Sequence, residues 1–279
     1  MSQIQTANVA PGSLEHWARE QPDTPAVIEG ERVLSWKAWN DEADRLAEGL
    51  ARRGLVAGDI LVTRMQIRAE WPIASAAAGK LGLKLLGLNW RLTPAETRYV
   101  LSNSGANAIL CDDADPAALA PAFEDLPLKL AASIDAAAEG FAPYAELIAD
   151  APEQPRFAAA NPSLILYTSG TTGLPKGVVM GARAASADPA LRQQMAEYQR
   201  SVAGGRAPEK DDVVMIVLPM HHGAGPGSVW GATARGVTMI FLRRFDPEEA
   251  LRLIAKHRVT AWTGVPTMYK RIAGLPAEI

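Results

Sequence analysis

The chain has 279 residues, 48% of them apolar, enough for one large domain or two modest ones around a buried core. Its 28 lysine and arginine residues nearly balance 31 aspartate and glutamate residues, so the chain lacks the overall basic field that gathers nucleic acid. The single cysteine, Cys111, excludes an internal disulfide and a cysteine-held structural zinc site, and we expect it to be a small buried apolar residue.

The sequence predicts neither a secretory signal at its N-terminus nor a membrane span. The N-terminal "MSQIQTANVAPGS" has neither the basic start nor the apolar stretch of a secretory signal. No run reaches the ~18 uninterrupted apolar residues of a membrane span. The longest ambiguous run, "WPIASAAAGKLGLKLLGL", is broken by Lys80 and Lys84. We therefore expect a cytoplasmic protein without a transmembrane segment, which agrees with the low cysteine usage.

The first half of the chain predicts alternating helices and strands. Ser13 and Ser35 are typical helix N-caps, and Gly54 lies just past the end of an amphipathic pattern. In chain order we predict a helix over 13–21, strands over 25–30 and 31–36, a helix from Ser35 to before Gly54, a strand over 59–65, a helix over 71–83, a strand over 84–89, a helix over 94–103 and a strand over 107–111. Residues 112–160 give weaker signals, typical of short elements and a linker-like surface run.

The second half continues the same alternation. We predict strands over 162–167, 213–219, 237–242 and 259–265, and helices over 184–202, over 247–257 and from 266 onward. Alternation with helices of this length indicates an α/β fold with mixed, mostly parallel sheets flanked by helices. We divide residues 1–279 into approximate subregions 1–160 and 161–279.

The segment "YTSGTTGLPKG", residues 167–177, follows a predicted buried strand and carries four Ser/Thr hydroxyls, three glycines and one lysine. Glycines let backbone N–H groups surround an oxyanion, the hydroxyls add donors, and Lys176 adds a positive charge on an open loop. The segment therefore predicts a cradle for phosphate groups. A Walker A loop is excluded because Gly177, not Ser or Thr, follows Lys176. A flexible linker is the alternative, but linkers seldom lie between apolar runs such as "LILY" and "VVM".

This segment closely resembles the phosphate-binding signature of the adenylate-forming superfamily, which includes acyl-CoA synthetases, peptide-synthetase adenylation domains and luciferase-like enzymes. Other segments are similar to family elements in the same order: "LSWKAWN" (34–40), "GKLGLKLLGLNWRLTPAE" (79–96), "LPMHHGAG" (218–225) and "TGVPTMY" (263–269). The chain is thus identified as a member of this superfamily, similar to the N-terminal part of its large domain.

The resemblance implies a role for each residue of the loop. Lys176 would be catalytic, because its ammonium would balance the charge of the leaving pyrophosphate. The hydroxyl of Thr168 or Thr172 would lie near Mg²⁺, and no other side chain of this chain would bind the metal ion. The residues implied to hold the nucleotide phosphates are Thr168, Ser169, Gly170, Thr171, Thr172, Gly173, Lys176 and Gly177.

His221 and His222 follow the predicted strand over 213–219, and ligands gather at the carboxyl ends of strands in open α/β sheets. The family pattern matches His222 to the histidine beside the carboxylate substrate, and His221 replaces the usual aromatic residue. The alternative for the pair is hydrogen bonding within a packed core. Core packing is also the alternative for each candidate for the apolar wall of the acid pocket: Met220, Trp230, Val265, Pro266 and Met268. The implied substrate pocket comprises His221, His222, Gly223, Ala224, Val265 and Pro266.

The resemblance implies an AMP-forming ligase that joins an apolar, fatty-acid-like or related acid to coenzyme A. A carboxylate attacks the α-phosphorus of ATP, pyrophosphate leaves, and a thiol then displaces AMP from the acyl-adenylate. The expected ligands are ATP, Mg²⁺, coenzyme A and the acid, and a homodimer is left open. Several later elements of the family have no counterpart before Ile279: the "Y-G-x-T-E" motif, the ribose-binding aspartate, the hinge and the small C-terminal domain. We therefore expect a partial chain that turns over little or no substrate alone.

Two alternatives remain open. An adenylation domain that loads a carrier protein usually pairs an acidic residue with the amino group of its substrate, and "LPMHHGAGPG" offers no carboxylate. A non-catalytic nucleotide-binding fragment is the other alternative.

Overall fold

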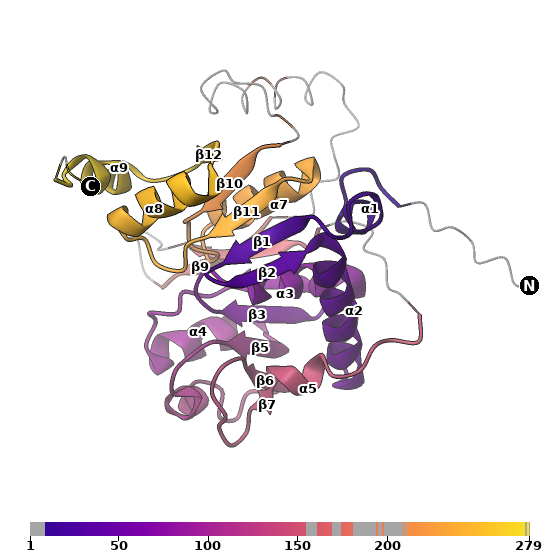
Figure 1. Cartoon of the computed structure of the whole chain (residues 1–279). Coiled ribbons are helices and arrows are strands. Elements are labelled where there is room, and N and C mark those ends of the chain that lie inside the picture. The colour runs from indigo at the N-terminus through magenta and orange to yellow at the C-terminus, as the bar shows by residue number, and fades with distance from the viewer. Residues whose placement is uncertain are drawn as a thin grey trace, which may run out of the picture.

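A computed structural model of the chain describes residues 9–154, 161–168, 174–180, 194, 197, 209, 211–276 and 278. Two β-sheets dominate these residues, and Figure 1 shows them stacked with helix α3 between them. The α/β class with mixed, mostly parallel sheets flanked by helices is confirmed.

The smaller sheet has five strands in the order β12-β10-β11-β1-β2. Its strands are β1 (Pro25–Glu29), β2 (Arg32–Ser35), β10 (Val213–Ile216), β11 (Thr238–Phe241) and β12 (Ala261–Trp262). All neighbours are parallel except the β1–β2 hairpin. The parallel pairing of Val27 with Met239 joins an early strand to a late one.

The larger sheet has seven strands in the order β7-β6-β5-β3-β4-β8-β9. Its strands are β3 (Ile60–Arg64), β4 (Lys84–Gly87), β5 (Ala108–Cys111), β6 (Leu130–Ser133), β7 (Ala142–Pro143), β8 (Leu164–Thr168) and β9 (Lys176–Met180). Only the β8–β9 pair is antiparallel. Because β1 and β2 lie in the other sheet, the sheets do not follow the 1–160 and 161–279 subregions.

Helices flank both sheets, and side chains cap several of them. The helices are α1 (Leu14–Glu20), α2 (Trp36–Arg52), α3 (Glu70–Leu81), α4 (Pro94–Ser104), α5 (Tyr144–Leu147), α7 (Ala224–Arg235), α8 (Pro247–His257) and α9 (Pro266–Ala273), with a 3-10 turn at Pro116–Ala122. Ser13 and Ser35 cap α1 and α2 as predicted, and Thr93 and Glu96 form a capping box on α4. No helix of the described residues combines the length and apolarity needed to cross a bilayer.

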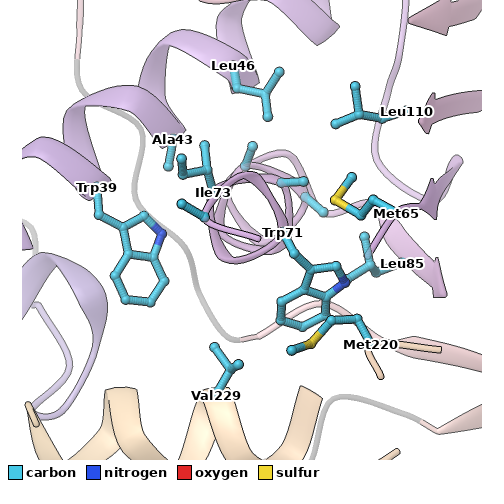
Figure 2. Close-up of a cluster of buried hydrophobic side chains, with 14 of the residues drawn as sticks. Trp39, Ala43, Leu46, Met65, Trp71, Ile73, Leu85, Leu110, Met220 and Val229 are labelled. Atoms are coloured by element: carbon cyan, nitrogen blue, oxygen red, sulfur yellow. The ribbon is translucent and has the colours of Figure 1, made fainter. Parts of the chain in front are cut away.

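Helix α3 is the centre of the main core. Trp71 and Ile73 are fully buried, and the alanines between them and Leu81 allow neighbouring elements to approach closely. Figure 2 shows α3 end-on, surrounded by side chains of α2, of the larger sheet and of α7. Trp230 of α7 donates its Nε1 hydrogen to Ser75 Oγ at 3.0 Å, which fixes α7 against α3.

Three regions differ from the sequence-based predictions. Part of 112–160 forms β6 and β7, which extend the larger sheet instead of running as a linker over the surface. Helix α7 was not predicted, because three glycines and a proline in "AGPGSVWGATAR" disguise its helical pattern. The strand predicted over 259–265 contracts to Ala261–Trp262. The helix predicted over 184–202 lies outside the described residues apart from two positions.

Candidate active site

The predicted phosphate loop sits at the tip of the β8–β9 hairpin. Thr168 ends β8, Lys176 begins β9, and the two residues face each other across the antiparallel ladder. Both are exposed, as is Gly177. Residues 169–173, which include Ser169, Gly170, Thr171, Thr172 and Gly173, lie outside the described part of the chain. We expected Lys176 on an open loop, and the structure corrects this expectation. Lys176 is a strand residue, and its backbone is held by the antiparallel pairing of β9 with β8.

Two tyrosines fasten the loop end of this hairpin to α4. The Tyr99 hydroxyl donates to the Pro175 carbonyl at 3.0 Å, and the Tyr167 hydroxyl donates to Asn103 Oδ1 at 2.7 Å. Gly177 leaves room for the Tyr167 ring, since a Cβ there would lie 3.0 Å from a ring atom. The loop end of the hairpin is therefore fixed in direction, and no local pattern in the sequence indicated the part played by α4.

The two histidines lie in a turn where the two sheets meet. The turn connects β10 to α7, and the His222 N–H donates to the Pro219 carbonyl at 3.2 Å. Gly87, the last residue of β4, packs directly on this turn: a Cβ there would lie 2.5 Å from Met220 O and 2.8 Å from His221 Cα. The carboxyl end of a strand in the larger sheet thus touches the loop that follows a strand of the smaller sheet.

The histidine turn also contacts the strand that leads to the hairpin tip. A Cβ on Gly223 would lie 3.1 Å from Cδ1 of Leu166, two residues before Thr168 in β8. The two candidate loops are therefore neighbours at the carboxyl edges of parallel strands, where ligands of α/β sheets bind.

The imidazole rings of His221 and His222 are 4.4 Å apart at an angle of 48°. Burial lowers the pKa of His221 to about 4, and the neighbouring His222 and Arg91 act in the same direction. His221 is consequently neutral near pH 7. Its Nδ1 is buried and finds no hydrogen-bond partner among the described residues, so hydrogen bonding in a packed core does not account for this atom.

The remaining pocket candidates fall into two groups. Ala224 begins α7 beside the histidine turn and is exposed. Val265, which is 43% exposed, and Pro266 lie on the surface at the start of α9. Met220 is 2% exposed and packs near Trp71 in the core (Figure 2), so core packing, the alternative raised from the sequence, describes it.

Known proteins share this arrangement of strands and loops. The family model described as "AMP-binding enzyme" matches residues 14–278. The chain belongs to this family. The fatty acid–[acyl-carrier-protein] ligase ScoC of Streptomyces coeruleorubidus is 30% identical over 263 residues, covering 93% of this chain and 48% of that protein. The 2-succinylbenzoate–CoA ligase of Bacillus licheniformis is 29% identical over 270 residues, covering 94% of this chain and 51% of that protein.

Solved structures of AMP-binding enzymes share the fold. An inhibitor-bound N-terminal domain of FACL13 from Mycobacterium tuberculosis has a TM-score of 0.78 at 26% identity, covering 94% of this chain and 64% of that one. The o-succinylbenzoate CoA synthetase of Bacillus subtilis, solved with ATP and magnesium ion, has a TM-score of 0.74 at 25% identity, covering 97% of this chain and 68% of that one. The chain spans about half the length of the curated relatives it matches. The resemblance stated from the sequence is confirmed at the level of the family.

The described part of the hairpin carries two hydrogen-bond donors. Thr168 and Lys176 offer a hydroxyl and an ammonium at the exposed hairpin tip. Within the described ranges, no group of three His, Cys, Asp or Glu residues is close enough to hold a metal ion.

Proposed function

We propose that the chain is part of an ATP-dependent ligase that activates an apolar carboxylic acid as its acyl-adenylate and passes the acyl group to a thiol. The observation that carries the proposal is the contact between the histidine turn and β8, which brings the predicted phosphate cradle and the predicted acid site to one place. The relatives of this family support the reaction class, because their names describe ligation of acids to coenzyme A or to a carrier protein.

In this proposal the hairpin tip binds the β- and γ-phosphates of ATP. The ammonium of Lys176 balances the charge that develops on pyrophosphate as the bond between the α-phosphorus and its bridging oxygen breaks. Mg²⁺, when bound, supplies further charge neutralisation on the phosphate oxygens. The fixed loop end of the hairpin matters because an in-line attack requires the nucleotide to be positioned before the carboxylate arrives.

The histidine turn positions the acid. His222 is exposed and lies beside the carboxylate, while the neutral ring of His221 offers hydrogen bonding without a full charge. Leu166 packs against Gly223, where an added Cβ would lie 3.1 Å from its Cδ1, and together with exposed Ala224 it gives the turn an apolar border that suits an apolar chain or ring. Val265 and Pro266 extend the apolar border toward α9.

Nucleotide binding by the 279-residue chain tests the phosphate cradle. In a calorimetric titration with MgATP, Lys176→Ala should bind at least about tenfold more weakly than the wild type. The reason is that a hydrogen bond to a charged group contributes ~1.5–3 kcal/mol. The matched control is Lys256→Ala on α8, an exposed lysine away from the hairpin, which should bind like the wild type. Equal affinity of the Lys176 and Lys256 variants would refute the cradle.

The thiol acceptor and the turnover need separate assays. Because the chain spans about half of its curated relatives, we expect ATP–pyrophosphate exchange near background from this chain alone. A robust exchange rate would contradict that expectation. Coenzyme A is the proposed acceptor, and ScoC makes a carrier-protein phosphopantetheine the second candidate. Incubating the pre-formed acyl-adenylate with each thiol and measuring thioester by mass spectrometry separates the two acceptors.

A further inference from the structure

Helix α4 holds the hairpin on either side of the pair formed by Thr168 and Lys176. Toward the loop, Pro175 precedes Lys176, and its carbonyl accepts the 3.0 Å hydrogen bond from the Tyr99 hydroxyl. Toward the base, Tyr167 precedes Thr168, and its hydroxyl donates to α4 at 2.7 Å. The backbone that carries the candidate hydroxyl and ammonium is therefore held at two points by a single helix.

The donor near the loop is itself fixed. The rings of Tyr99 and Tyr167 pack against the apolar core that α4 shares with the larger sheet. Helix α4 begins at the capping box of Thr93 and Glu96, and it ends at Gly105, which has the left-handed conformation typical of a helix C-terminus. Because ring and helix are both held, the Tyr99 hydroxyl has a defined position from which to bind the hairpin.

Lys176 depends on this contact because of its place in the sheet. Strand β9 is the outer strand, so β8 is its only partner among the described strands. An edge strand leaves one row of backbone groups unpaired, so pairing restrains it from one side only. Lysine has a flexible side chain that ends in a compact charge, so the position of its backbone decides where the ammonium can reach. The hydrogen bond to Pro175 adds a second restraint, one residue before Lys176.

The glycine after Lys176 belongs to the same arrangement. Gly177 lies opposite Tyr167 in the ladder, and a Cβ on it would lie 3.0 Å from Cε2 of the tyrosine ring. A side chain there would displace the ring and with it the hydroxyl that reaches Asn103. The absence of a side chain at Gly177 therefore preserves the second contact between the hairpin and α4.

We propose that Tyr99 is a positioning residue for the proposed adenylation: its hydroxyl holds the Pro175 carbonyl and thereby directs the Lys176 ammonium to the phosphates. The inference rests on the proposed function, which assigns Lys176 to ATP. In this role Tyr99 touches no reacting atom and acts through the backbone of β9. Such positioning strengthens binding, because the lysine then loses less conformational freedom when the phosphates arrive.

A double-mutant cycle on the 279-residue chain tests this role, with MgATP as the titrant in calorimetry. Tyr99→Phe removes only the hydroxyl and should weaken MgATP binding about threefold to tenfold, the loss expected for one neutral hydrogen bond. In the Lys176→Ala background the same substitution should change the affinity by less than about twofold, because the group that Tyr99 positions is already gone.

Hydrogen exchange of the ligand-free chain measures the restraint without nucleotide. The amides of Lys176–Met180 should exchange faster in Tyr99→Phe than in the wild type, since the hairpin opens more often. Tyr144→Phe is the matched control: it removes a 3.1 Å hydrogen bond from a tyrosine hydroxyl to Glu42, on α5, which follows β7 at the opposite edge of the sheet. This control should leave both hairpin exchange and MgATP affinity unchanged, and circular dichroism melts verify that each variant is folded.

The outcomes separate this inference from the phosphate cradle. Equal MgATP affinities of the wild type and Lys176→Ala would refute the cradle, and this inference with it. Weaker binding by Lys176→Ala, together with unchanged affinity or unchanged hairpin exchange in Tyr99→Phe, would overturn this inference and leave the cradle standing. An equal loss from Tyr99→Phe with and without Lys176 would also overturn it, because Tyr99 would then act on the fold and not through the lysine.

Discussion

Replacing Gly87 by alanine should force β4 and the histidine turn apart. The new Cβ would lie 2.5 Å from Met220 O and 2.8 Å from His221 Cα, against an ordinary contact of about 3.5 Å. The overlap is therefore roughly 1 Å, and both opposing atoms belong to the backbone, so no side-chain rotation relieves it. Overpacking of this kind destabilises a core by about 1–3 kcal/mol.

Guanidinium unfolding of Gly87→Ala, followed by circular dichroism and tryptophan fluorescence, measures the effect. The free energy of unfolding should fall by about 1–3 kcal/mol, and the NMR signals of His221 should shift under native conditions. Gly231→Ala is the matched control: that glycine lies inside α7 with no heavy atom within 4 Å of an added Cβ. Because alanine favours helix over glycine, this control should gain about 0.5–1 kcal/mol. A Gly87→Ala protein as stable as the wild type would show that the two elements are not in tight contact.

Three further measurements probe buried ionisable groups. The side chain of Lys80 is fully buried, 3.1 Å from Glu15 and 3.0 Å from Asp44. Lys80→Met should therefore lower the free energy of unfolding by about 3–5 kcal/mol, because it leaves buried carboxylates without their cation. A loss below about 1 kcal/mol would contradict the buried ion cluster. Burial, with a smaller effect of nearby carboxylates, raises the pKa of the Cys111 thiol to about 12. A thiol reagent at mildly alkaline pH should therefore label the unfolded chain but not the native one. Rapid labelling of the native chain would count against this burial. Burial and neighbouring positive charge lower the pKa of His221 from 6.5 to about 4, so the unfolded chain takes up a proton at a higher pH than the folded chain does. The free energy of unfolding should therefore decrease as the pH falls from 6.5 toward 4. His221→Gln should reduce this decrease, and an unchanged pH profile of stability would disprove the low pKa.

Elements with strong local signals were predictable. Helix α2 follows its predicted pattern closely, because its apolar residues recur at helical spacing between the cap Ser35 and Gly54. Helix α8 matches its predicted bounds, 247–257, since a capping aspartate, a proline and two acidic residues mark its start. The carboxyl-edge location predicted for the histidine pair also agrees with the structure, because it follows from parallel strand direction alone.

Features that depend on distant partners were not predictable. The pattern around Lys80 marked only an interruption of an apolar run, yet its side chain is buried against carboxylates of α1 and α2. A cavity beyond the carboxyl ends of β3 and β10 gathers residues from five separate segments, and no local spacing relates Arg91 to Arg244 or Arg271. Strand β6 escaped prediction because alanine carries little strand propensity, and its pairing with β5 decides its conformation.

The pairing of Val27 with Met239 places a constraint on how the chain folds as it leaves the ribosome. At about 5–20 residues per second, the partner strand of β1 is synthesised roughly 10–40 s after β1 itself. Through that interval β1 has only β2 beside it, and a lone two-stranded hairpin is marginally stable in water. The seven-stranded sheet, whose β3 to β7 are contiguous in sequence, can assemble in the meantime. The nascent chain therefore leaves the β11-facing edge of β1 unpaired for tens of seconds during translation.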